Sequence, residues 1–139
     1  MSKSLLFRLF GLGKIPRRYR SLLQSEGMVL AEEGLACRVY YRNYRAPGKR
    51  FVHKHVAFPG SLVITQKRFA VFTPTKPLIN ILRNDPRMSK LEISTPRTDR
   101  LLIGFRGEDF DSRTRGEISC TFHISRAELF KDTLCTPGG

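Results

Sequence analysis

An alternation of apolar and polar residues, with the two-residue period of a β-strand, is the feature that most constrains this chain. Apolar residues occupy every second position from Ile118 to Ile124, and Ser119, Thr121 and His123 lie between them. Successive side chains of a strand point to opposite faces of a sheet, so this segment buries one face and exposes the other. One buried face per strand is typical of antiparallel sheets.

Short runs rich in Val, Ile, Tyr and Phe, separated by turn residues, extend this pattern back to Met28. The runs predict strands over residues 35–45, 50–58, 61–66, 68–73, 78–82, 91–95, 100–105 and 117–124. Pro47 and Gly48 between the first two runs favour the central positions of a type II turn, which predicts a hairpin. About eight short strands at this spacing predict an all-β fold, either an antiparallel barrel or a strongly bent sheet.

Helical signals flank the strands. Ser125 with Glu128 three residues later forms a capping-box pattern, which predicts a C-terminal helix. Before the strands, apolar residues recur at helical spacing at Leu12, Ile15, Tyr19, Leu22 and Leu23. This amphipathic helix can pack on the domain or lie on an anionic bilayer. We therefore divide the chain into a basic N-terminal extension, residues 1–24, and a β-domain with its C-terminal helix, residues 25–139.

The positive charge is concentrated in the first part of the chain. Residues 1–84 contain 16 Lys or Arg and 3 Glu, whereas residues 85–139 contain 9 basic and 9 acidic residues. A surface of one sign attracts partners of the other, so the candidate partners are phospholipid head groups, acidic proteins and nucleic acid. With 40% hydrophobic residues the chain can bury a core, and no apolar run reaches the roughly 18 residues of a membrane-spanning helix.

Residues 60–72 read Gly-Ser-Leu-Val-Ile-Thr-Gln-Lys-Arg-Phe-Ala-Val-Phe. This segment resembles the G-x-L-x-x-T-x-x-R-[LF]-x-x-F signature of bacterial PH and GRAM-like domains. The resemblance implies an antiparallel PH/GRAM-like barrel that a C-terminal helix closes at one end. It also implies that Leu62, Ile64, Phe69 and Val71 help to fill the barrel. The same superfold hosts lipid binding, peptide binding and structural roles, so the resemblance supports the fold more than the function.

PH domains that bind phosphoinositides commonly use basic residues around their first hairpin, and this hairpin carries such residues beside its turn. We expect an anionic head group to be bound by Arg42, Arg45, Lys49, Arg50 and Lys54. We expect the N-terminal helix to contact a membrane or partner through Arg17, Arg18 and Arg20. The alternative is a protein-interaction domain, in which an edge of the barrel or the helix binds an acidic partner. Tyrosines among arginines also suit single-stranded nucleic acid, but no RNP-type, KH-type or zinc-finger signature accompanies them.

No combination of residues indicates a reaction, a cofactor or a metal site. His53 and His55 share one strand face but lack a third ligand. Glu108, Asp109 and Asp111 resemble the start of a calcium loop, but Arg113 and Arg115 occupy positions where further oxygen ligands would be needed. A nucleophile with its base and orienting group is absent from the sequence pattern, so we expect a binding module rather than an enzyme. Three cysteines without a short spacing favour a reducing, cytoplasmic compartment, and the basic residues favour a location at the periphery of a membrane.

Overall fold

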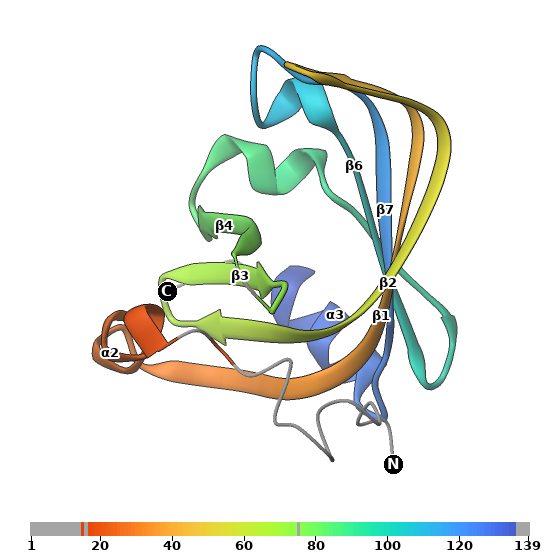
Figure 1. The fold of residues 1–139 in the computed structure, drawn as a ribbon. Helices are drawn as coiled ribbons and strands as arrows, with labels where there is room; N and C mark the ends of the chain where they lie inside the picture. Colours follow the sequence, from red (N-terminus) through yellow and green to blue (C-terminus); the bar gives the residue numbers. More distant parts are fainter. Residues whose placement is uncertain (1–14, 16, 75, 136–139) are drawn as a thin grey trace.

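The computed structural model describes Ile15, residues 17–74 and residues 76–135. Its main element is one antiparallel sheet with the strand order β4-β3-β2-β1-β7-β6-β5 (Figure 1). The strands are β1 (Met28–Ala46), β2 (Lys49–Thr65), β3 (Arg68–Phe72), β4 (Pro77–Leu82), β5 (Glu92–Arg97), β6 (Arg100–Arg106) and β7 (Arg115–His123). Helix α2 (Arg17–Ser25) precedes the sheet and α3 (Ala127–Cys135) follows it, and the 3-10 turns η1 (Pro86–Lys90) and η2 (Gly107–Asp109) lie between strands.

The predicted all-β class and antiparallel pairing are confirmed, in the form of a bent sheet. Strands β4 and β5 end the strand order and do not pair with each other within the described ranges, so the sheet does not close into a barrel. None of the helices in these ranges is long and apolar enough to cross a bilayer.

Two long strands, β1 and β2, run through both halves of the sheet. They pair with each other from Met28–Thr65 to Ala46–Lys49. Strand β7 pairs with β1 only from Cys37 to Arg45, whereas β3 pairs with β2 only from Ser61 to Ile64. The half of the hairpin near its open end therefore belongs with β3 and β4, and the half near its turn belongs with β7, β6 and β5 (Figure 1).

The hairpin bends where the sequence predicts a break between two strands. The expected strands 50–58 and 61–66 are one continuous strand, β2, and the pairing with β1 shifts between Glu32 and Leu35. Pro59 costs no sheet hydrogen bond to β3 because that pairing begins only at Ser61. A Cβ on Gly60 would lie 3.1 Å from the carbonyl oxygen of Phe72, so glycine permits the close approach of the two strands.

The bend encloses the main hydrophobic core. Leu62, Ile64, Phe69 and Val71 are fully buried there, in a bent sheet rather than in the closed barrel that the resemblance implies. Ile103 and Phe122 contribute from the other half of the sheet. Helix α3 closes the core with Ala127, Phe130 and Leu134. The helix begins two residues after Ser125, and Glu128 accepts a hydrogen bond of 2.5 Å from Thr95 of β5.

Helix α2 packs on the opposite face of the first half of the sheet. Ile15 and Leu23 are buried against Val63, Ala70 and Phe72. The Tyr19 ring lies 5.0 Å from the Phe72 ring. Leu22 is exposed, and Leu12 lies outside the described residues. Of the two roles open for the amphipathic stripe, the residues that the structure describes show packing on the domain.

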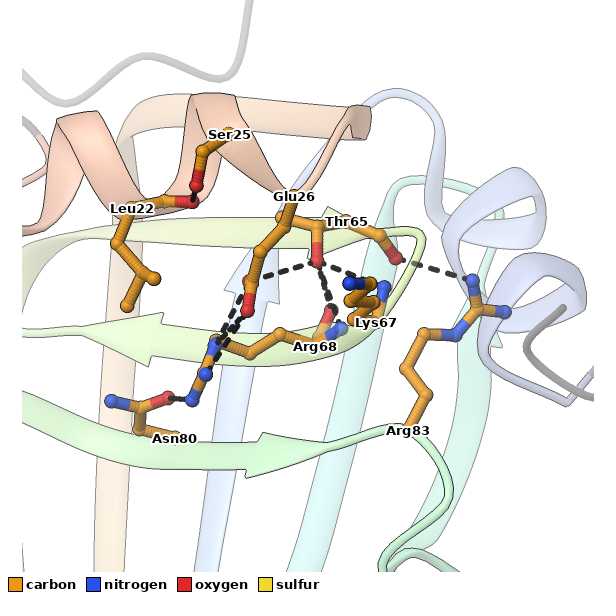
Figure 2. A network of polar contacts seen from close by, with 8 residues as sticks. All are labelled: Leu22, Ser25, Glu26, Thr65, Lys67, Arg68, Asn80 and Arg83. Atoms are coloured by element: carbon orange, nitrogen blue, oxygen red, sulfur yellow. Dashed lines mark hydrogen bonds and ion pairs between the residues drawn. The ribbon is translucent and has the colours of Figure 1, made fainter.

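A polar network joins the end of α2 to the turn between β2 and β3 (Figure 2). Arg68 Nε donates hydrogen bonds to both carboxylate oxygens of Glu26, at 3.0 and 3.2 Å, and its Nη1 donates to Asn80 of β4 at 2.8 Å. The Thr65 hydroxyl donates to Glu26 at 3.2 Å and accepts from the Arg68 backbone N–H at 2.8 Å. The Glu26 and Arg68 side chains are only 10% and 19% exposed, so water screens this ion pair little.

Stability should therefore depend on the charge of Glu26. Hydrogen bonding from Arg68 holds the pKa of Glu26 below its ordinary value of 4.5, so its contribution is complete above that pH and is lost as the pH falls through the folded-state pKa. We expect E26Q to lower the free energy of unfolding by about 1–3 kcal/mol near neutral pH. Urea unfolding of E26Q and the wild type should show this difference in unfolding free energy narrowing as the pH falls below 4.5.

The matched control for this prediction is E117Q. Glu117 lies 3.7 Å from Arg42, but both side chains are 57% exposed. Its change in stability should stay within about 0.5 kcal/mol at either pH. If the difference in unfolding free energy between E26Q and the wild type stays constant across this pH range, the stabilising role assigned to the Glu26 charge is wrong.

Candidate functional site

The tip of the β1–β2 hairpin carries most of the residues expected to bind an anion. Ala46 pairs with Lys49 across the predicted two-residue turn, and Gly48 has a φ of +75°. This value suits the second central position of a type II turn. The tip lies at the far end of the hairpin from α2 (Figure 1).

Arginines from three adjacent strands meet near this tip. Arg45 of β1 pairs with Arg50 of β2 on one side and with Arg115 of β7 on the other. All three line a hollow of about 200 Å³, together with the exposed Val52. In the part of the chain that the structure describes, no carboxylate lies within 4.0 Å of these three guanidinium groups. We call Arg45, Arg50 and Arg115 the arginine row.

Like charges directly opposite each other destabilise a sheet, so the arginine row has an electrostatic cost in the free protein. An anion between the guanidinium groups would offset that cost and accept charge-assisted hydrogen bonds. Sequence reasoning identified Arg45 and Arg50 but missed Arg115, because only the pairing of β1 with β7 brings it to them.

An irregularity in β1 separates this row from a second group of residues. Asn43 has a φ of +50°, in the left-handed region that asparagine tolerates better than most residues. In a regular strand, residues three positions apart point to opposite faces. Tyr41 and Tyr44 instead line one cavity, and their ring centroids lie 4.9 Å apart.

The cavity has a volume of about 380 Å³ and opens beside the hairpin. Its apolar walls come from the hairpin, β4, the end of β6, the segment after η2, and β7. They include Tyr41, Tyr44, Phe51, Val56, Phe58, Pro77, Leu78, Phe105, Phe110 and Ile118. Burial raises the pKa of the Tyr41 phenol, so that hydroxyl remains a neutral hydrogen-bond donor at physiological pH.

Three lysines also line the cavity: Lys49, Lys54 and Lys76. The Lys54 ammonium group lies 4.1 Å from the centroid of the Phe51 ring. None of the three has a carboxylate within 4.0 Å among the described residues. Asp111 is the one acidic side chain in the lining, and it accepts a hydrogen bond of 2.9 Å from the Arg113 backbone N–H.

The structure thus divides the expected head-group residues among three places. Arg45 and Arg50 belong to the arginine row, and Lys49 and Lys54 line the cavity. Arg42 lies 3.7 Å from Glu117 and lines a different hollow with Tyr40 and Ser119.

The expected arginines of α2 lie apart from the hairpin tip. Arg17 and Arg18 are exposed, whereas Arg20 forms an ion pair of 2.7 Å with Glu33. Between α2 and the tip runs the whole of β1, whose 19 residues correspond to roughly 60 Å along the strand. The two basic groups therefore lie at opposite ends of the β1–β2 hairpin (Figure 1).

The remaining candidates have ordinary structural partners. Tyr40 shares a hydrogen bond with His53 Nδ1 and packs against the His55 ring, so both histidines lie on one face as their spacing predicts. Within the described ranges, no group of three or more His, Cys, Asp or Glu side chains could hold a metal ion. Burial raises the pKa values of the Cys37 and Cys120 thiols, which keeps both in the unreactive protonated form.

The acidic run in the segment after β6 is also engaged locally. Glu108 accepts a hydrogen bond of 3.2 Å from the Gly116 N–H, and Asp109 lies 3.5 Å from Lys90. Sequence analysis assigned no site to this acidic run, yet Phe110 and Thr114 from the same segment line the cavity. The apolar Phe110 within an otherwise charged run was the available signal.

Comparison with protein-family models finds none that matches the chain, and comparison with curated proteins finds no match.

Gly116 holds β7 against the irregular part of β1, so its replacement tests this arrangement. Its φ is +112°, and an added Cβ would lie 2.5 Å from the Asn43 carbonyl oxygen and 2.7 Å from Tyr44 Cα. We expect G116A to lower the free energy of unfolding by more than about 2 kcal/mol, because backbone strain and steric overlap add. Thermal or urea unfolding measures this loss.

G48A is the matched control because Gly48 also has a positive φ, but nothing lies within 4 Å of its added Cβ. We expect G48A to lower the free energy of unfolding by only about 1–2 kcal/mol, which is the cost of the backbone conformation alone. Equal losses in G48A and G116A would show that the close approach of β7 to Asn43 is unimportant.

Proposed function

We propose that this chain is a non-enzymatic, PH/GRAM-like binding module that attaches to anionic phospholipid membranes through its β1–β2 hairpin. The observation that carries the proposal is the arginine row, in which Arg45, Arg50 and Arg115 meet with no carboxylate within 4.0 Å in the described part of the chain. A lipid phosphate is the kind of group that planar guanidinium donors recognise through paired hydrogen bonds.

The position of the row favours a surface as the ligand. The hairpin tip lies at the end of the sheet remote from α2, beside the start of β7, where a flat membrane can reach it (Figure 1). The exposed Val52 beside the row offers an apolar side chain to the interface. Each Arg near an anionic leaflet contributes about 1 kcal/mol, so the row supplies roughly 3 kcal/mol of attraction.

The PH/GRAM-like assignment within this proposal has two supports. The residues that carry the sequence resemblance form the end of β2, the turn and β3, and their apolar members are buried in the core. A C-terminal helix packs across the open bend of the antiparallel sheet. We therefore also propose that the protein acts at the cytoplasmic surface of a membrane.

Binding to vesicles tests the proposal. We expect the wild type to co-sediment with vesicles of phosphatidylcholine mixed with phosphatidylserine, but not with phosphatidylcholine alone. The triple variant R45Q/R50Q/R115Q should lose roughly 100-fold in affinity, which corresponds to about 3 kcal/mol. Binding by the wild type should also weaken as salt shortens the Debye length to about 10 Å near 0.1 M.

The control K67Q/R97Q/K131Q removes the same charge from positions outside the arginine row and the cavity. It should keep most of the wild-type affinity if the row acts as a site, and it should lose as much as the triple variant if only net charge matters. Failure of the wild type to bind anionic vesicles at low salt would overturn the proposal in favour of a protein partner.

A further inference from the structure

We propose that the cavity beside the hairpin is a binding site for a single-chain anionic amphiphile, with a medium-chain fatty acid as the ligand class. The alkyl chain would lie among the aromatic side chains, and the carboxylate would meet Lys49, Lys54 and Lys76. This site uses other cationic residues than the arginine row, although Tyr44 and Phe51 line both hollows. Its ligand is a free monomer in water, so the inference does not depend on membrane attachment.

The size and walls of the cavity fit an alkyl chain. Its volume of about 380 Å³ lies at the lower end of the range of about 300–1,000 Å³ for small-molecule sites. Such sites are mainly apolar with a few polar groups that set orientation. Here Phe105 and Ile118 form buried parts of the wall, whereas Tyr44, Phe51 and Phe110 are only partly buried. A chain placed among these rings would remove further apolar surface from water.

The charges around the cavity select the sign of the ligand. The lining contains three lysines and one carboxylate, and that carboxylate, Asp111, already accepts hydrogen bonds from Arg113. An aromatic cavity could in principle hold a quaternary ammonium ion through cation–π contacts. In this cavity Lys54 already occupies the face of Phe51, at 4.1 Å from its centroid, so a second cation would be repelled.

The backbone conformation at Asn43 also indicates that the cavity is a ligand site rather than an incidental gap between side chains. The left-handed conformation of Asn43 places Tyr44 beside Tyr41 in the cavity wall. Close approach of Gly116 to Asn43 and Tyr44 holds that conformation in place. Unfavourable backbone conformations of this kind persist where the surrounding structure enforces them, and they cluster at ligand sites.

Three probes that differ only in the head group test the inference: octanoate, octan-1-ol and octyltrimethylammonium. Octanoate and octyltrimethylammonium would be titrated below their micelle concentrations, and octan-1-ol below its solubility limit, into the whole, ¹⁵N-labelled chain, with amide shifts recorded by NMR. We expect saturable binding of octanoate with shifts centred on Tyr41, Phe105 and Thr114. Octan-1-ol should bind at least about tenfold more weakly, because it lacks the charge-assisted hydrogen bonds.

Two variants separate the contributions of charge and space. K54M/K76M should weaken octanoate binding at least about tenfold and leave octan-1-ol binding nearly unchanged. V56F places a ring in the cavity and should weaken both ligands. K67M/K131M is the matched control, since neither lysine lines the cavity, and it should bind octanoate like the wild type.

Absence of octanoate binding, or shifts centred outside the cavity, would overturn the inference. Binding of octyltrimethylammonium as tight as that of octanoate would overturn the assigned preference for an anion. If V56F does not fold, K54M/K76M still tests whether the cavity lysines bind octanoate. Vesicle binding by R45Q/R50Q/R115Q reports on the membrane proposal alone. Octanoate binding that survives in that variant would therefore separate the two sites.

Discussion

The bend of the β1–β2 hairpin, where β2 closely approaches β3 near Gly60, is the constraint on which the rest of this structure depends. A Cβ at this position would lie 3.1 Å from the carbonyl oxygen of Phe72, so a larger residue would require the two strands to shift by a few tenths of an ångström. The bend lets one pair of strands serve both halves of the sheet. It also places the inner faces of the two halves around one core, which α3 then covers. A straight hairpin of this length would leave those apolar faces in water.

The Glu26–Arg68 network stabilises the half of the sheet that lies away from the hairpin turn (Figure 2). It ties α2, the β2–β3 turn and β4 together, while Ile15 and Leu23 fix the helix on the sheet. The other end of the hairpin has no comparable ion pair among its arginine row and cavity lysines in the described part of the chain. This division separates the part that stabilises the fold from the part that is available to ligands.

At the hairpin tip, a single backbone irregularity places two kinds of chemistry side by side. The left-handed Asn43 turns Tyr44 into the cavity, while Arg45 remains in the arginine row. The row offers planar donors for phosphate, and the cavity offers apolar walls with ammonium groups. Two neighbouring positions of one strand can therefore serve different ligands.

The sequence by itself determined the antiparallel class, the hairpin turn at Pro47–Gly48, both terminal helices and the burial of Leu62 and Phe69. Each of these was predicted from local patterns: the periods of strands and helices, and the residues typical of turns and helix starts. The tertiary structure alone decided that β2 continues through Pro59, because the cost of a proline depends on whether a neighbouring strand needs its N–H. It alone brought Arg115 to Arg45, and Phe110 to Tyr41, from segments distant in the sequence. Residue spacing along one strand carries no information on which distant strand lies beside it, and for this reason the site could be predicted only in part.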